Sequence, residues 1–176
     1  MSKATDSVTT LNIAVLTVSD TRTEQTDTSG DFLVAAAKEA GHSIAAKQIV
    51  IDDIYRIRAI MSQWIADLNI HAVITTGGTG FSGRDSTPEA VSVLFDKTID
   101  GFGELFRAIS YDEIGTSTIQ SRAFAGLANN TVIFCLPGST SACRTGWEKI
   151  IRSQLDSTYR PCNFVGVLQT RKHGEQ

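Results

Sequence analysis

The sequence predicts an α/β fold in which helices cover both faces of a mostly parallel sheet. Two observations indicate this class. Short apolar runs alternate along the chain with stretches in which apolar residues recur at helical spacing. The apolar runs are also nearly continuous, which is typical of strands buried on both faces of a parallel sheet. Strands and helices that alternate in this way build a layered α/β domain.

The first half of the chain contains three predicted strands and two predicted helices. They are strands at 11–18, 44–51 and 71–76 and helices at 31–40 and 53–68. Gly41 ends the first helix as a C-terminal cap. The second helix is predicted because its apolar residues fall on one face. These residues are Ile54, Ile57, Met61, Trp64, Ile65 and Leu68.

The second half is predicted to be mainly helical around one further buried strand. The elements are helices at 89–97, 103–111, 119–128 and 141–155 and a strand at 131–136. Ser86 can cap the first of these helices, with Pro88 in its first turn and Glu89 three residues after the cap. Residues 115–118 separate the second helix from the third.

One compact domain accounts for most of the 176 residues. We expect a polar N-terminal arm at 1–10, the α/β domain at 11–155 and a C-terminal extension at 156–176. The extension is expected to pack against a neighbouring subunit.

The composition, with 41% hydrophobic and 20% charged residues, is that of a soluble globular protein. The net charge of −3 argues against general nucleic-acid binding, because such proteins present a basic face. No apolar run is long enough to span a membrane, and the first ten residues lack the apolar core of a secretory signal. Three cysteines at no zinc spacing predict free thiols, and a cytoplasmic location is expected.

Polar or glycine-rich segments follow four of the predicted strands. They are Ser19-Asp20, Ile51-Asp52, Thr75-Thr76-Gly77 and Pro137-Gly138. Ligands of parallel α/β sheets bind beyond the carboxyl ends of the strands. The sequence therefore predicts one site that these four segments line.

The loop at residues 78–83, GTGFSG, matches the dinucleotide pattern G-x-G-x-x-G. Three features argue against NAD or FAD. The loop follows the third strand, the helix cap comes only at Ser86, and no strand ends in an acid about 20 residues further on. A Walker loop would need a lysine after the last glycine. The backbone N–H groups of residues 77–80 can instead hold an anion, or the loop is a tight turn without a ligand.

Two acids, Asp52 and Asp85, follow the second strand and the glycine loop. Carboxylates beside a phosphate repel it unless a cation lies between them, and Mg²⁺ prefers one or two carboxylates together with phosphate oxygens. This arrangement predicts metal-assisted phosphoryl or nucleotidyl transfer. Each acid alone also has a structural interpretation, as a residue that caps or precedes a helix. Positive charge for the phosphate is expected from Arg22, Arg84 or Arg122.

Seven segments together resemble the MogA/MoaB family of molybdenum cofactor biosynthesis proteins. They are Ser19-Asp20, Asp27-Thr-Ser-Gly30, Thr75-Thr-Gly-Gly-Thr-Gly80, Arg84-Asp-Ser-Thr-Pro-Glu89, Gly101-Phe-Gly-Glu104, Ser121-Arg122 and Leu136-Pro-Gly-Ser139. The combination of TTGGTG with R-D-x-T-P-[DE] is quite specific. The stretches ELFRAISYDEIGTSTIQSRA and PGSTSACRTGWE are most similar to the MoaB branch.

The resemblance implies a three-layer, molybdopterin-binding-like α/β fold and a homo-oligomer, either a trimer or a hexamer. It implies that the protein binds molybdopterin and, as a molybdopterin adenylyltransferase, transfers AMP from Mg-ATP to its terminal phosphate. The two family aspartates that support catalysis and hold magnesium fall on Asp52 and Asp85. The family's other pocket positions fall on Ser19, Asp20, Asp27, Ser29, Thr76, Gly77, Gly78, Thr79, Gly80, Glu104, Ser121, Pro137, Gly138 and Ser139.

The sequence leaves a second function open. A paralogue in the same pathway would bind the pterin without catalysing the transfer. Neither function includes a nucleic acid or a membrane as a partner.

Overall fold

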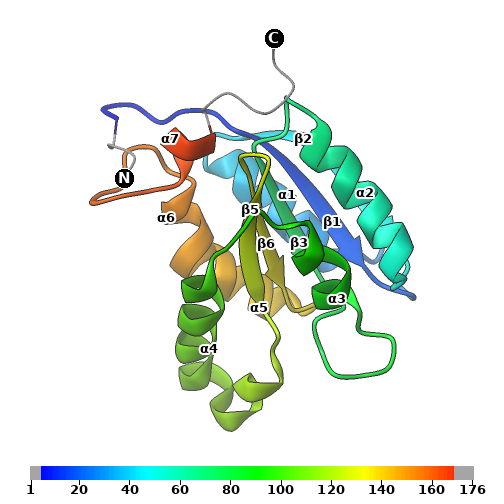
Figure 1. Cartoon of the computed structure of the whole chain (residues 1–176). Helices are drawn as coiled ribbons and strands as arrows, with labels where there is room; N and C mark the ends of the chain where they lie inside the picture. Colours follow the sequence, from blue (N-terminus) through cyan, green and yellow to red (C-terminus); the bar gives the residue numbers. More distant parts are fainter. Residues whose placement is uncertain (1–4, 169–176) are drawn as a thin grey trace.

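The computed structural model describes residues 5–168, which form a three-layer α/β domain around one six-stranded sheet (Figure 1). The strand order is β2-β1-β3-β6-β5-β4. The strands are β1 (Asn12–Val18), β2 (Ser43–Val50), β3 (Ala72–Thr76), β4 (Lys97–Thr98), β5 (Phe124–Ala128) and β6 (Thr131–Leu136). The pairs β1–β2, β1–β3 and β3–β6 are parallel, whereas β5 runs antiparallel to both β6 and β4. The predicted mostly parallel sheet is therefore confirmed.

Helices cover both faces of the sheet (Figure 1). The α-helices are α1 (Thr28–Glu39), α2 (Ile54–Ala66), α3 (Thr87–Val91), α4 (Asp100–Ile114), α5 (Thr140–Gly146), α6 (Arg152–Gln154) and α7 (Val165–Leu168). Two 3₁₀ segments, η1 (Ser92–Leu94) and η2 (Gly115–Gln120), and the π-helical turn η3 (Trp147–Ile151) complete the list. Within residues 5–168, no helix combines the length and the apolar content that crossing a bilayer requires.

The two hydrophobic cores follow from the two-residue period of the strands. In β6, Phe134 and Leu136 face the layer of α1, α4, α5 and α7, while Ile133 and Cys135 face the layer of α2 and α3. All four side chains are buried. Each fully buried large side chain stabilises the fold by roughly 1.5–3 kcal/mol. This burial on both faces explains why the strand sequences are nearly continuous runs of apolar residues.

The predicted helix over 119–128 is wrong. Residues 115–120 form η2, and residues 124–128 form the strand β5, which makes a hairpin with β6. Both residues of the hairpin turn, Asn129 and Asn130, have positive φ (48° and 59°), as a two-residue hairpin turn of the favoured twist requires. Pairing with β6 thus overrides the local helix preference of an Ala- and Leu-containing segment.

Other boundaries also differ from the prediction, three of them with consequences for the packing. Helix α1 begins at Thr28 instead of residue 31, because the Asp27 side chain accepts a hydrogen bond from the backbone N–H of Gly30 and caps the helix. The helix predicted over 89–97 ends in η1, and residues 97–98 form the edge strand β4. Leu68 lies beyond the end of α2 and is exposed.

The N-terminal arm and the C-terminal extension are attached to each other. Ser157 accepts a hydrogen bond from Thr5 N at its carbonyl and one from Thr9 N at its hydroxyl, which in turn donates to the carbonyl of Ser7. Within the described part of the extension, Val165 and Leu168 pack into the chain's own core, and the expected contact with a neighbouring subunit stays a prediction. Residues 1–4 of the arm and 169–176 of the extension lie outside the described residues.

Candidate functional site

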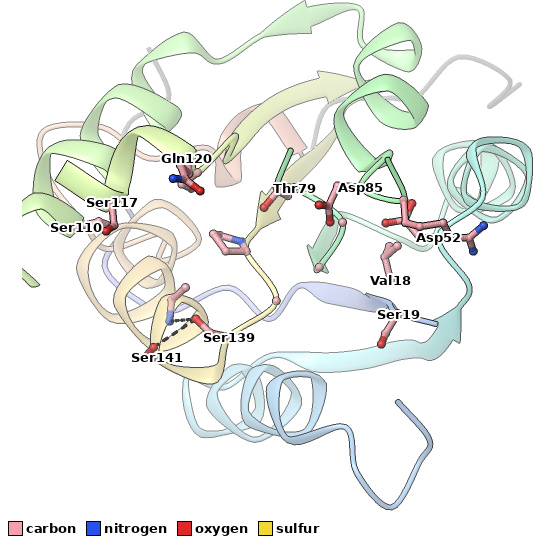
Figure 2. A pocket seen from close by; sticks show the side chains of 18 of the residues that line it. Val18, Ser19, Asp52, Thr79, Asp85, Ser110, Ser117, Gln120, Ser139 and Ser141 are labelled. Atoms are coloured by element: carbon pink, nitrogen blue, oxygen red, sulfur yellow. Dashed lines mark hydrogen bonds between the residues drawn. The ribbon is translucent and has the colours of Figure 1, made fainter. Parts of the chain in front are cut away.

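The predicted site at the strand ends exists as a cavity of about 580 Å³. Segments that follow β1, β2, β3 and β6 line it, as the sequence predicts. From these segments come Ser19, Asp20, Asp52, Gly77, Gly78, Thr79, Gly80, Asp85, Pro137, Gly138 and Ser139. Figure 2 shows Asp52 and Asp85 on one side of the cavity, with Ser110, Ser117 and Gln120 across from them.

The opposite wall of the cavity comes from α4 and η2, which extend past the carboxyl edge of the sheet (Figure 1). Its lining residues are Phe106, Ser110, Glu113, Ile114, Ser117, Gln120 and Ser121. Sequence reasoning identified only Ser121 among them. The small polar residues at 115–118, between the helices predicted at 103–111 and 119–128, indicated a loop. They did not indicate that this loop faces the cavity.

The antiparallel direction of β5 brings Ser121 and Arg122 to this edge. Phe124, at the start of β5, pairs with Cys135, near the end of β6. The residues before β5 therefore lie beside the carboxyl ends of the parallel strands. Ser121 lines the cavity, and its buried hydroxyl has no hydrogen-bond partner among residues 5–168.

The glycine loop after β3 is held by neighbours on both sides. Gly77 and Gly78 have positive φ values of 100° and 65°, which glycine adopts without steric cost. Gly77 N donates to Leu136 O, and the Thr87 hydroxyl donates to Gly77 O at 2.9 Å. Thr87 N also donates to Gly78 O. The loop is therefore fixed to β6 and to the start of α3.

Asp52 faces the cavity and is not a helix cap. The neighbouring Asp53 caps α2, because its side chain accepts hydrogen bonds from the backbone N–H groups of that helix's first turn. Asp52 Oδ1 accepts hydrogen bonds from both the backbone N and the hydroxyl of Ser86. Burial raises the pKa of Asp52 above its usual value; the hydrogen bonds from Ser86 oppose this shift, and the nearby charge of Asp85 adds to it.

Asp85 lines the same cavity from the far end of the glycine loop. Its Oδ2 accepts a hydrogen bond from Ser82 N at 2.8 Å, which closes the segment 82–85 into a turn. The expectation that Asp52 and Asp85 face one crevice is confirmed, since both line one cavity and the charge of one acts on the other.

The arginines behave differently from the prediction. Arg84 lines the cavity, but its Nε and Nη2 atoms each donate to Asp20 at 2.9 Å, and this pairing lowers the pKa of Asp20. Arg22 donates to the carbonyl of Thr26, and the guanidinium of Arg122 donates to backbone carbonyls of the glycine loop. Neither Arg22 nor Arg122 lines the main cavity.

The described lining of the cavity is strongly acidic. Its carboxylates belong to Asp20, Asp52, Asp85 and Glu113, and its guanidinium to Arg84. Glu113 is oriented by the hydroxyl of Thr145, which lies 2.9 Å from both of its carboxylate oxygens. This lining repels an anionic ligand that is not accompanied by a cation.

The comparison with known proteins identifies the family. The family model described as "Probable molybdopterin binding domain" matches residues 14–157. The chain belongs to this family. "Molybdenum cofactor biosynthesis protein B" of Escherichia coli (strain K12) is 57% identical over 152 residues, which cover 86% of this chain and 89% of the relative. The protein of the same name from Bacillus subtilis is 44% identical over 147 residues, with coverages of 83% and 86%.

Solved structures of molybdopterin-binding domains share the fold. A crystal structure of "Molybdenum cofactor biosynthesis protein B" superposes with a TM-score of 0.81 at 45% identity, covering 84% of this chain and 92% of that one. The tungsten cofactor synthesizing protein MoaB from Pyrococcus furiosus gives a TM-score of 0.73 at 38% identity, with coverages of 80% and 90%. A MogA structure gives 0.71 at 27% identity, with coverages of 77% and 89%.

Three predicted pocket residues of this molybdopterin-binding domain lie beside the main cavity, lining a smaller one of about 60 Å³. Asp27 is buried and accepts hydrogen bonds from Thr17 as well as from the start of α1. Ser29 donates to the carbonyl of Gly138, and Thr76 donates to that of Pro137. Their contacts hold the ends of β1, β3 and β6 together beneath the site.

Glu104 does not lie where it was predicted. It lines a separate hollow of about 260 Å³ at the start of α4, together with Asp100 and Arg107. The residues of α4 that line the main cavity lie further along the helix, between about half a turn and three turns closer to η2 than Glu104; they are Phe106, Ser110, Glu113 and Ile114.

Proposed function

We propose that this chain acts in molybdenum cofactor biosynthesis, where it binds molybdopterin and transfers AMP to its terminal phosphate from Mg-ATP. The names of its relatives support the pathway. The observation that carries the chemistry is the position of two acids, Asp52 and Asp85, in one cavity beside a glycine loop.

The residues around the two acids suit a magnesium ion. Asp52 Oδ2 lies only 2.6 Å from the position that a Cβ of residue 78 would occupy, and Asp85 Oδ2 lies 2.8 Å from that of residue 80. Glycine at both positions keeps the space beside the carboxylates open. Across the described part of the chain, no cluster of three or more His, Cys, Asp or Glu side chains forms a complete metal site. Two carboxylates that leave the other positions to phosphate oxygens and water match the preference of Mg²⁺.

The charge of the cavity supports the same conclusion. Its carboxylates outnumber its guanidinium, and Arg84 is already paired with Asp20. A free triphosphate would be repelled by this lining, whereas its magnesium complex carries less negative charge and would bind through Asp52 and Asp85.

The proposed transfer needs positioning more than acid–base catalysis. The terminal phosphate of molybdopterin attacks the α-phosphorus of ATP, a new P–O bond forms, and the bond to the leaving pyrophosphate breaks. The phosphate is already an anion, so no side chain has to remove a proton. The backbone N–H groups of the glycine loop would hold an anionic group of a substrate, and Asp52 and Asp85 would hold the magnesium ion. The bound ion would neutralise charge on the triphosphate and on the leaving pyrophosphate.

Replacement of Asp85 tests this proposal. We expect Asp85→Asn to lower the rate of pyrophosphate release from ATP in the presence of molybdopterin by about 10²-fold or more, because a neutral amide is a poor magnesium ligand. Molybdopterin binding, measured by quenching of intrinsic fluorescence, should be retained. Asp53→Asn is the matched control, since asparagine also caps a helix and Asp53 does not line the cavity.

Two results separate catalysis from simple binding. Full turnover by Asp85→Asn would exclude the assigned metal role. A wild-type protein that binds molybdopterin but releases no pyrophosphate would favour the non-catalytic pterin-binding function instead.

A homo-oligomer is part of the same proposal. Large apolar side chains are exposed along α4 and η2, among them Tyr111 (57%), Ile114 (53%) and Ile119 (73%). Apolar surface gathered on one projecting element is typical of a subunit contact. Sedimentation equilibrium distinguishes a trimer from a hexamer, and a monomer at high concentration would contradict the proposal.

A further inference from the structure

The guanidinium of Arg122 contacts the glycine loop without lining the cavity. Its Nε lies 2.9 Å from Gly80 O and 3.3 Å from Thr79 O, and its Nη2 donates to Asp85 O at 3.0 Å. Its Nη1 pairs with Glu89 on α3. Thr79, Gly80 and Asp85 line the cavity but Arg122 does not. One side chain therefore joins both ends of the segment 80–85.

The direction of these carbonyls fixes the direction of the neighbouring amides. In a trans peptide the C=O and the N–H of the same unit point to opposite sides. The Thr79 carbonyl accepts hydrogen bonds from the backbone N–H and from Nε of Arg122, so the N–H of Gly80 points away from Arg122, and Gly80 itself lines the cavity. The same geometry applies to the peptide between Asp85 and Ser86.

The peptide between residues 85 and 86 links Arg122 directly to a candidate metal ligand. Its carbonyl accepts from Arg122 Nη2 at 3.0 Å, and its N–H donates to Asp52 Oδ1 at 3.0 Å. Arg122 and Asp52 thus bind the two ends of one peptide group. Hydrogen bonds at the two ends of a peptide polarise it in the same direction and strengthen each other.

Only an arginine can make this set of contacts. The planar guanidinium presents donors in several fixed directions, whereas the ammonium of lysine is a single point at the end of a flexible stem. The Arg122 guanidinium also lies 5.1 Å from the ring centre of Phe81, a residue within the segment that it joins. Its side chain is only 24% exposed, so these contacts are largely protected from water.

We propose that Arg122 is a positioning residue of the site, which turns the loop amides toward the cavity and holds Asp52 and Asp85 in place through the backbone. It does not bind the substrate phosphate itself. The effect on catalysis rests on the proposed adenylyl transfer, whereas the effect on the loop does not.

Amide exchange measures the positioning directly. The backbone N–H groups of Ser82, Asp85 and Ser86 each donate a hydrogen bond within or beside the loop. In Arg122→Lys, which keeps the charge and the stem, we expect their exchange followed by NMR to accelerate at least tenfold. Exchange in β1 and β6 should stay within about twofold of wild type.

Glu89→Gln is the matched control for the exchange experiment. It removes the ion pair with Nη1 and leaves the carbonyl contacts of Arg122 intact. We expect it to exchange like the wild type at all three loop positions. If Arg122→Lys left the three amides as protected as before, the proposal would be overturned. An equal loss of protection in β1 and β6 would also overturn it, because Arg122 would then stabilise the whole domain.

Kinetics provide the readout that a purely structural role would not change. In Arg122→Lys and Arg122→Gln we expect kcat to fall about 10- to 100-fold and the magnesium concentration for half-maximal rate to rise several-fold. The KM for molybdopterin should stay within about twofold. A rise in this KM with an unchanged kcat would assign Arg122 to substrate binding and refute the positioning role. If the wild type releases no pyrophosphate, the proposed function fails, and the exchange experiment still decides the role of Arg122.

Discussion

Gly77→Ala is the substitution that most directly tests how the glycine loop is built. Gly77 combines a φ of +100° with close packing against the end of β1. The ideal position of a Cβ at residue 77 lies 2.1 Å from the carbonyl oxygen of Val18, whereas ordinary contacts begin near 3.4 Å. Because the obstructing atom belongs to the backbone of a buried strand, it cannot rotate away as a side chain would.

The expected cost has two parts. A side chain at positive φ costs about 1 kcal/mol. Restoring an ordinary contact requires the loop and β1 to separate by about 1.3 Å, and overpacking of this kind costs a further 1–3 kcal/mol or so. We therefore expect Gly77→Ala to lower the free energy of unfolding by about 2–4 kcal/mol. The displaced loop should also lower the rate of the proposed transfer by about 10²-fold, since misplacement by an ångström has effects of this size.

Two control glycine variants, measured by urea denaturation, separate the cost of positive φ from the cost of close packing. Gly41 has a φ of +90° but nothing within 4 Å of its Cβ position, so Gly41→Ala should cost only about 1 kcal/mol of unfolding free energy. Gly83 lies in the same loop region with open space and no positive φ, so Gly83→Ala should cost roughly nothing. If Gly77→Ala were no less stable than Gly41→Ala, the close packing against Val18 would not restrict the loop, and the reasoning would be refuted.

Two further predictions concern stability. His42 is buried, its Nδ1 accepts a hydrogen bond from Leu11 N, and burial lowers its pKa below the usual 6.5. The unfolded chain therefore binds a proton below about pH 6.5 that the folded chain excludes, and stability should fall as the pH decreases from about 7.5 to about 5.5. Urea midpoints should fall less in His42→Gln, and an equal fall would contradict the assignment. The double variant Val165→Ala/Leu168→Ala should lose about 2–4 kcal/mol of unfolding free energy in dilute monomer, whereas unchanged stability would mean that the extension does not belong to this chain's core.

Much of the fold could be predicted because its signals are local. The buried strands are recognisable in the sequence as short apolar runs, and α2 has a clear apolar face formed by Ile57, Met61 and Trp64. The strand β5 was missed because its residues have no strong strand preference, and its pairing with β6 is a contact that the segment itself does not encode. The two asparagines between the apolar runs, Asn129 and Asn130, were the signal for a hairpin turn.

The candidate site was predictable to the same degree. Parallel strands bring their carboxyl ends to one edge, so Asp52 and the glycine loop could be placed together before the structure was known. The wall formed by α4 and η2 could not be predicted in this way. Its position depends on the direction of α4 relative to the sheet, which no local sequence pattern specifies. The error at Glu104 has the same origin, since motif membership does not specify which turn of a helix reaches a cavity.

The attachment of residues 5–9 to Ser157 has a practical consequence for handling this protein. These residues precede β1, so they sit at the amino edge of the sheet, on the opposite side from the cavity. A dye or a sensor-chip linker coupled at an exposed residue such as Ser7 would leave the mouth of the cavity clear. Ligand titrations on an oriented, immobilised sample would then report the site without obstruction by the support.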